Sequence, residues 1–273
     1  MNRLSVFFRN IEISCISNEI QGPAIVFLHG NSLSSDSFKK QFEDPGLQDF
    51  RLIAIDLPGH GLSQTAINPQ DDYNLFYFRD AVLHVIRHLK VENFLLAGHS
   101  LGGHIAMECL PFLDNCKGIM IWAAPPIRLP LNMAEIFLPN PSLSLLFKKD
   151  LDETDIMQLA SILADENYLE EITAMIEQSD PRFREVLPLS LGNNMVSDEY
   201  RLLADSGIPV AILHGENDQL VNFDYYGQLT IPTLWKKRAI IVKNSTHTPQ
   251  LESFNEFNER VLQFCSGVFK MNR

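Results

Sequence analysis

The chain has 273 residues, of which 45% are hydrophobic and 21% are charged, and its mean hydropathy is −0.03. This balance is ordinary for a globular protein in water, and no apolar run is long enough to cross a membrane, so we expect no membrane anchor. The 22 Lys and Arg against 34 Asp and Glu give a net charge of −12, which disfavours nucleic acid and anionic lipid as partners. The length fits one large domain, with or without an insertion.

The beginning of the sequence shows no secretory signal, since only residues 6–8 form an apolar run before Arg9. We therefore expect a cytoplasmic protein. The four cysteines, at positions 15, 109, 116 and 265, are widely spaced and include no Cys-x-x-Cys pair, so they are expected to be free, buried thiols. No set of Cys and His has zinc-ligand spacing, and we expect no metal.

Short aliphatic runs alternate with longer amphipathic stretches along most of the chain. Residues 4–16 alternate more regularly and predict an antiparallel hairpin at a sheet edge. Nearly unbroken apolar runs are typical of parallel strands covered on both faces, so we expect a mainly parallel central sheet flanked by helices. The expected strands are 24–28, 52–55, 94–97, 118–122, 210–213 and 239–242, and the expected helices are 76–89, 101–110 and 254–264.

The alternation stops after residue 122. Six of the fifteen prolines lie between positions 111 and 141, and two helical stretches, 153–164 and 167–178, follow with no strand between them. We expect residues 126–203 to form a helical insertion, a cap on a core domain made of residues 1–125 and 204–273.

The sequence Gly-His-Ser-Leu-Gly at 98–102 follows directly on an expected strand and opens an expected helix. A serine on so sharp a turn needs a strained backbone, and glycines two residues before and after it remove Cβ atoms that would collide with the turn. In this context the pattern predicts a nucleophile elbow with Ser100 as the nucleophile. The alternative is that the small residues only allow a strand and a helix to pack closely.

A serine nucleophile needs a general base and an acid that orients the base. Asp218 follows the expected strand 210–213, and His247 follows the expected strand 239–242. Loops at the carboxyl ends of parallel strands line one edge of a sheet, so the three side chains can meet there. The order Ser100, Asp218, His247 is that of the α/β-hydrolase triad.

Other polar residues close to these motifs are alternatives or supports. Glu216 and Asp224 compete with Asp218 as the acid. His29 and His99 flank the expected site and are expected to be structural. His104, one turn into the elbow helix, is expected to pack within the protein.

Outside the expected insertion, nearly the whole chain resembles the α/β-hydrolase superfamily. The sequence His-Gly-Asn-Ser at 29–32 resembles the oxyanion loop of that family, which implies that the backbone N–H groups of Asn31 and Leu101 bind the oxyanion of a tetrahedral intermediate. The side-chain amide of Asn31 is a second candidate for contact with substrate. The sequence Asp-Leu-Pro-Gly-His-Gly at 56–61 resembles a turn of the family that we interpret as structural.

Part of the chain is also similar to an N-acyl-homoserine lactonase of this fold. Where that resemblance would place a Glu as the triad acid, this chain has Asp218 or Glu216, and the spacing from Gly215 favours Asp218. The similar segments are 29–32, 57–61, 100–105 with Glu108, and 234–235 with His247.

Together these features predict a serine hydrolase that cleaves a carboxylic ester or lactone through an acyl-enzyme, with N-acyl-homoserine lactone as one candidate and no cofactor. A thioesterase or a carbon–carbon bond hydrolase with the same triad remains an alternative, as does a ligand receptor with slow turnover. We expect some apolar residues of the insertion to line a pocket for an apolar acyl group, the alternative being that they pack onto the core. These residues are Ile127, Leu129, Leu131, Ile136, Phe137, Leu145, Leu146, Phe147 and Leu159.

Overall fold

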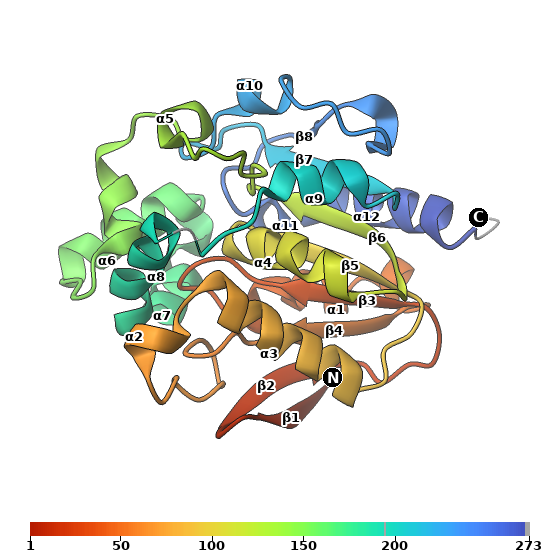
Figure 1. The fold of residues 1–273 in the computed structure, drawn as a ribbon, viewed down its shortest axis with the longest axis horizontal. Helices are drawn as coiled ribbons and strands as arrows, with labels where there is room; N and C mark the ends of the chain where they lie inside the picture. Colours follow the sequence, from red (N-terminus) through yellow and green to blue (C-terminus); the bar gives the residue numbers. More distant parts are fainter. Residues whose placement is uncertain (194, 271–273) are drawn as a thin grey trace.

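A computed structural model describes residues 1–193 and 195–270 (Figure 1). Its eight strands form one sheet in the order β1-β2-β4-β3-β5-β6-β7-β8. The β1–β2 and β2–β4 pairs are antiparallel and the others are parallel, so the predicted edge hairpin and mainly parallel sheet are confirmed. The strands are β1 (Asn2–Phe8), β2 (Ile11–Ser17), β3 (Ala24–Leu28), β4 (Arg51–Ile55), β5 (Phe94–His99), β6 (Cys116–Trp122), β7 (Val210–Gly215) and β8 (Ile240–Val242).

Helices cover both faces of the sheet. Figure 1 shows α3 and α4 in front of the sheet and α12 behind it. The α-helices are α1 (Lys39–Phe42), α2 (Pro69–Asp72), α3 (Leu75–His88), α4 (Leu101–Cys109), α5 (Met133–Ile136), α6 (Glu153–Leu163), α7 (Leu169–Gln178), α8 (Arg182–Gly192), α9 (Glu199–Asp205), α10 (Phe223–Tyr226), α11 (Pro249–Glu252) and α12 (Phe254–Val268). The 3-10 helices are η1 (Ser35–Phe38), η2 (Pro45–Leu47), η3 (Leu110–Phe112), η4 (Pro141–Phe147), η5 (Glu166–Tyr168) and η6 (Trp235–Lys237).

The central strands are apolar throughout because alternate side chains enter two different hydrophobic layers. In β3, Val26 and Leu28 belong to the layer that includes α3 and α4, whereas Ile25 and Phe27 belong to the layer that includes α12. All four side chains are fully buried. A strand of this kind shows no polar alternation, which is why its sequence is a continuous apolar run.

The segment between β6 and β7 contains helices and no strand among its described residues. The predicted helical stretches 153–164 and 167–178 correspond to α6 and to η5 with α7. Helix α8 was not predicted, because it contains Pro188 and carries a weak apolar periodicity. Helix α9 runs across the expected boundary at residue 203, where Leu203 is fully buried. We refer to residues 126–203 as the cap segment, and its status as a separate unit is a proposal.

The four cysteines are free and buried, as their spacing predicts. Burial raises the pKa of Cys15 and of Cys116 to about 11. Among the described residues, no helix is both long enough and apolar enough to cross a bilayer.

Candidate active site

Ser100 lies on a strained turn between β5 and α4. Its φ of 49° and ψ of −117° place it outside the regions that L-residues normally adopt, and its side chain makes no capping hydrogen bond to the helix. A Cβ added at Gly98 would lie 2.4 Å from the carbonyl oxygen of Gly102, and one added at Gly102 would lie 2.3 Å from the carbonyl oxygen of Leu28. The turn can therefore form only because both flanking positions are glycine.

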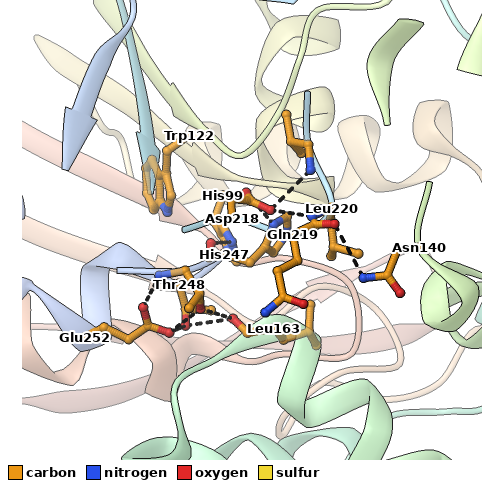
Figure 2. Close-up of polar contacts among 12 residues, drawn as sticks. His99, Trp122, Asn140, Leu163, Asp218, Gln219, Leu220, His247, Thr248 and Glu252 are labelled. Atoms are coloured by element: carbon orange, nitrogen blue, oxygen red, sulfur yellow. Dashed lines mark hydrogen bonds and ion pairs between the residues drawn. The ribbon is translucent and has the colours of Figure 1, made fainter. Parts of the chain in front are cut away.

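His247 and Asp218 form a buried hydrogen-bonded pair in the loops after β8 and β7. The Nδ1 of His247 donates to the Oδ2 of Asp218 at 2.9 Å, and the Oδ1 of Asp218 accepts from the backbone N–H of Leu220 at 2.8 Å and of Val221 at 3.2 Å (Figure 2). Burial acts to raise the pKa of the Asp218 carboxyl, but its pairing with His247 and its other hydrogen bonds outweigh burial and hold that pKa below 3.8. Asp218 is thus held as a carboxylate.

Glu216 and Asp224, the other two candidates for the acid, are both exposed. Glu216 is exposed and accepts from the backbone N–H of Asn244 at 3.0 Å. Asp224 is exposed in the first turn of α10. Of the three candidates for the acid, Asp218 is the one that the structure pairs with His247.

The loops that carry this pair are hydrogen-bonded to the cap segment. The carbonyl oxygen of Leu163 accepts from the Oγ1 of Thr248 at 3.0 Å, and the carbonyl oxygen of Gln219 accepts from the Nδ2 of Asn140 at 3.4 Å (Figure 2). The hydroxyl oxygen of Thr248 also lies 3.0 Å from a carboxylate oxygen of Glu252, which is an alternative acceptor for its single hydrogen. The positions of the loops that carry Asp218 and His247 therefore depend in part on contacts with the cap segment.

His29 and His99 are fully buried and bind the backbone. The Nε2 of His99 donates to the carbonyl oxygen of His247 at 2.8 Å, and the His99 ring stacks on Trp122. The Nε2 of His29 accepts from the N–H of Leu57 at 2.9 Å, which joins the 29–32 loop to the 56–61 turn. Burial lowers the pKa of both histidines, so both are neutral near pH 7.

The 56–61 turn is held together by Asp56, in agreement with its structural interpretation. The Asp56 carboxylate accepts from the backbone N–H of Ser35 at 2.7 Å and of Leu62 at 3.2 Å. Gly61 has a φ of 53°, and a Cβ there would lie 2.4 Å from Asp56 Oδ1. Within the described residues, no group of three or more His, Cys, Asp and Glu side chains could hold a metal ion.

Asn31, Ser100 and Leu101 line the same pocket. Leu101 is the first residue of α4, so its backbone N–H has no partner within the helix and is available at the helix N-terminus. The Nδ2 of Asn31 donates to the carbonyl oxygen of Leu146 at 3.1 Å, and its Oδ1 accepts from the hydroxyl of Ser32 at 2.8 Å. The Asn31 amide is therefore already engaged by the protein.

Ser100 and His247 line a small, mainly apolar pocket of about 80 Å³. Six of the apolar cap residues singled out from the sequence line it, whereas Leu145 and Leu159 are buried elsewhere and Leu129 is 44% exposed. Some of these apolar residues therefore line the pocket, whereas others pack within the protein. The lining consists of Asn31, Leu75, Ser100, Leu101, His104, Ile127, Leu131, Met133, Ile136, Phe137, Leu146, Phe147, Leu187, Leu191, Leu220 and His247.

His104 packs within the protein, as expected from the sequence, and in addition pairs with a buried carboxylate. Its Nδ1 donates to the Oε2 of Glu199 in α9 at 2.8 Å, and the same oxygen accepts from the backbone N–H of Ile127 at 2.9 Å. Glu199 is fully buried and was not singled out from the sequence, because it lies 95 residues from its partner. Burial acts to lower the pKa of His104, but the charge and hydrogen bond of Glu199 outweigh burial and raise that pKa above 6.5.

This pair makes stability depend on pH. Because the folded-state pKa of His104 is raised, the stabilisation by Glu199 is fully present below about pH 6.5 and is lost as pH rises through the folded-state pKa. We expect the advantage of the wild type over Glu199→Gln, measured as free energy of unfolding in urea, to be larger at pH 6 than at pH 8. The difference should change by up to about 1.4 kcal/mol for each unit by which the pKa of His104 is raised.

His88→Gln, at an exposed position of α3, serves as the control and should leave the pH dependence unchanged. The nearby Glu108 has a pKa that burial and the charge of Glu199 both raise above 4.5, so the comparison is also made in a Glu108→Gln background, where this contribution is absent. An advantage of equal size at pH 6 and pH 8 would show that Glu199 does not raise the pKa of His104.

Comparison with known proteins agrees with the fold described above. The model of the alpha/beta hydrolase family matches residues 25–260. The chain belongs to the alpha/beta hydrolase family, and the fold expected from its sequence is confirmed.

Individual relatives resemble the chain over most of its length. The AB hydrolase superfamily protein YisY of Bacillus subtilis (strain 168) is 27% identical over 260 residues, covering 90% of this chain and 92% of YisY. The bifunctional esterase/perhydrolase DCH of Acinetobacter calcoaceticus is 26% identical over 239 residues, covering 81% of each chain. A serine-to-glycine variant of the N-acyl homoserine lactonase AidH, solved with N-hexanoyl homoserine lactone, superposes with a TM-score of 0.95 at 25% identity over the full length of both chains.

Proposed function

We propose that this protein is a serine hydrolase that cleaves a carboxylic ester or lactone through an acyl-enzyme. One observation carries the proposal: the strained Ser100 and the base of the His247–Asp218 pair line the same apolar pocket. A serine presented on such a turn, beside an imidazole that a buried carboxylate orients, is the arrangement that nucleophilic acyl transfer requires.

In the proposed reaction, Ser100 Oγ attacks the carbonyl carbon while His247 Nε2 accepts the hydroxyl proton. The carbonyl π electrons move to oxygen, and the backbone N–H groups of Asn31 and Leu101 donate to this oxyanion. His247 then returns the proton to the leaving alkoxide as the ester bond breaks. Water repeats the sequence on the acyl-enzyme and releases the acid, while Asp218 keeps His247 in the productive tautomer throughout. Removal of one oxyanion donor typically costs about 100- to 1000-fold in rate.

The names of the relatives support an ester-type substrate. DCH is an esterase/perhydrolase, and AidH is an N-acyl homoserine lactonase that was solved with N-hexanoyl homoserine lactone. The small, mainly apolar pocket of this chain suits a short acyl group beside a compact alcohol or lactone. We therefore propose N-acyl-homoserine lactones as one substrate class, with simple acyl esters as the other.

The test is a panel of p-nitrophenyl esters, N-acyl-homoserine lactones and acyl thioesters, with kcat/KM measured for each together with labelling of Ser100 by a fluorophosphonate. We expect labelling, with the highest kcat/KM on esters or lactones. Preference for thioesters would replace the proposed substrate with the thioesterase alternative. Labelling with negligible turnover on every substrate would favour a receptor of the same fold.

The pocket predicts a dependence on acyl-chain length. Each methylene buried in the transition state contributes up to ~0.8 kcal/mol, about fourfold in kcat/KM, so two methylenes give about fifteenfold. We expect kcat/KM to rise from acetyl to butyryl to hexanoyl esters and to fall once the pocket is full.

A larger side chain in the lining should shift this optimum. Ile136→Phe fills part of the pocket and should move the optimum to a shorter acyl chain, whereas Leu129→Phe, at a position outside the lining that is 44% exposed, should leave it unchanged. A series that is flat from the acetyl ester onward, in the wild type and in both variants, would contradict acyl binding in this pocket.

A further inference from the structure

A buried arginine of the cap segment has no carboxylate as its hydrogen-bond partner. Arg184 of α8 is 3% exposed, and its guanidinium donates only to neutral oxygens among the described contacts. The acceptors are the carbonyl oxygens of Lys148 at 3.0 Å and Lys149 at 3.1 Å and the hydroxyls of Ser32 at 3.1 Å and Ser179 at 2.8 Å. Burial lowers the pKa of Arg184 to about 10, so the group is still charged near pH 7.

A cation is costly to bury without a carboxylate bonded to it, and Asp180 and Asp150, the carboxylates that favour its charge, are not among its hydrogen-bond acceptors, so its position calls for an explanation. The hydrogen bond from Arg184 to Ser32 supplies this explanation. A guanidinium can only donate, so the Ser32 oxygen accepts from Arg184, and the Ser32 hydroxyl hydrogen goes to the Oδ1 of Asn31 at 2.8 Å. Arg184 therefore fixes the direction of each hydrogen bond in the series Arg184–Ser32–Asn31.

This series of hydrogen bonds also fixes the orientation of the Asn31 amide. With its oxygen bound to Ser32, the amide NH₂ group points to the carbonyl oxygen of Leu146, which accepts at 3.1 Å. The Asn31 side chain is thus held at one end by Arg184, through Ser32, and at the other end by η4. Both anchors belong to the cap segment, whereas Asn31 itself belongs to the loop after β3.

We propose that Arg184 is a positioning residue through which the cap segment sets the oxyanion loop in its working conformation. The inference rests on the proposed function, because it assigns the backbone N–H of Asn31 to the oxyanion. Holding the Asn31 side chain fixes the peptide that carries this N–H before substrate arrives. The buried positive charge also favours negative charge that develops nearby in a medium of low dielectric. Both effects act on the transition state more than on the bound substrate, so they raise kcat rather than lower KM.

Two variants separate the hydrogen-bond chain from the packing of the arginine. Arg184→Met keeps much of the side-chain volume and removes all donors. Ser32→Ala leaves Arg184 and its other three contacts in place and breaks only the link to Asn31. Arg201→Met is the control, because it removes an arginine of the same segment whose side chain is 77% exposed.

The measurements are kcat and KM on p-nitrophenyl butyrate and the Ki of a butyl boronic acid, which forms a tetrahedral adduct with a serine. We expect Arg184→Met to lower kcat about 10- to 100-fold and Ser32→Ala to lower it by a smaller factor, with KM within about threefold of the wild type. The Ki of the boronic acid should rise in parallel with the loss in kcat. A merely structural role would not link these two quantities. The control should stay within about twofold throughout.

If kcat and Ki of Ser32→Ala and of a folded Arg184→Met remain within about twofold of the wild type, the positioning role is wrong. If Arg184→Met does not fold, as judged by near-UV circular dichroism, Ser32→Ala decides alone. Failure of the proposed function would look different, because the wild type itself would then neither label with a fluorophosphonate nor hydrolyse esters.

Discussion

Ser100→Ala is expected to lose at least about 1000-fold in hydrolysis while the fold stays intact. The hydroxyl makes no capping hydrogen bond, so its removal takes no structural contact away from α4. Alanine is also small enough for a turn with a φ of 49° that glycines surround. The loss is large because nucleophile and base act as a unit. The measurement is kcat/KM on the best ester or lactone, with thermal unfolding as the check on the fold.

Ser144→Ala, at an exposed serine of η4, is the matched control and should keep full activity. A purified Ser100→Ala protein that retained more than a tenth of the wild-type activity would remove Ser100 from the reaction.

Asp218→Asn is expected to cost up to roughly 10,000-fold in kcat, whereas Glu216→Gln should change kcat by less than a few-fold. The reason lies in the two oxygens of Asp218. Its Oδ1 accepts two backbone N–H groups, so an asparagine would keep its carbonyl oxygen there and turn its NH₂ group toward His247 Nδ1. His247 would then carry its proton on Nε2 and could not accept one from Ser100. Steady-state kinetics of both variants make the comparison.

Glu216→Gln is isosteric with its parent and lies two residues from Asp218, which makes it a stringent control. A larger loss for Glu216→Gln than for Asp218→Asn would move the acid to residue 216 and leave the assignments of Ser100 and His247 in place.

The sequence predicts the parts of the fold that depend on local patterns. Strands such as β3 are found at their true limits because a buried parallel strand is a continuous apolar run bounded by turn residues. The turn at Ser100 is found for a similar reason, since the glycines that allow it lie within two residues of the serine. Helix α8 is missed because Pro188 interrupts its pattern, and tertiary packing decides its conformation.

Long-range polar contacts could not be predicted. The contact from Arg184 to Ser32 joins residues 152 positions apart, and the contact from Asn31 to Leu146 joins residues 115 positions apart. Nothing in the neighbourhood of either residue in sequence signals its partner. His104 illustrates the same limit, since its location on α4 was predicted while its ionic partner on α9 was not.

The buried cysteines allow transient local unfolding of the protein to be measured without an added label. A thiol reacts as its thiolate. Cys15 and Cys116 are buried and have a pKa of about 11, so in the folded protein both thiols are protonated and a reagent in solution cannot reach them. Alkylation can proceed only when the sheet transiently unfolds. The rates at which iodoacetamide modifies Cys15 and Cys116 in the native protein, measured separately for each residue, therefore report how often β2 and β6, the strands that carry them, separate from their neighbours.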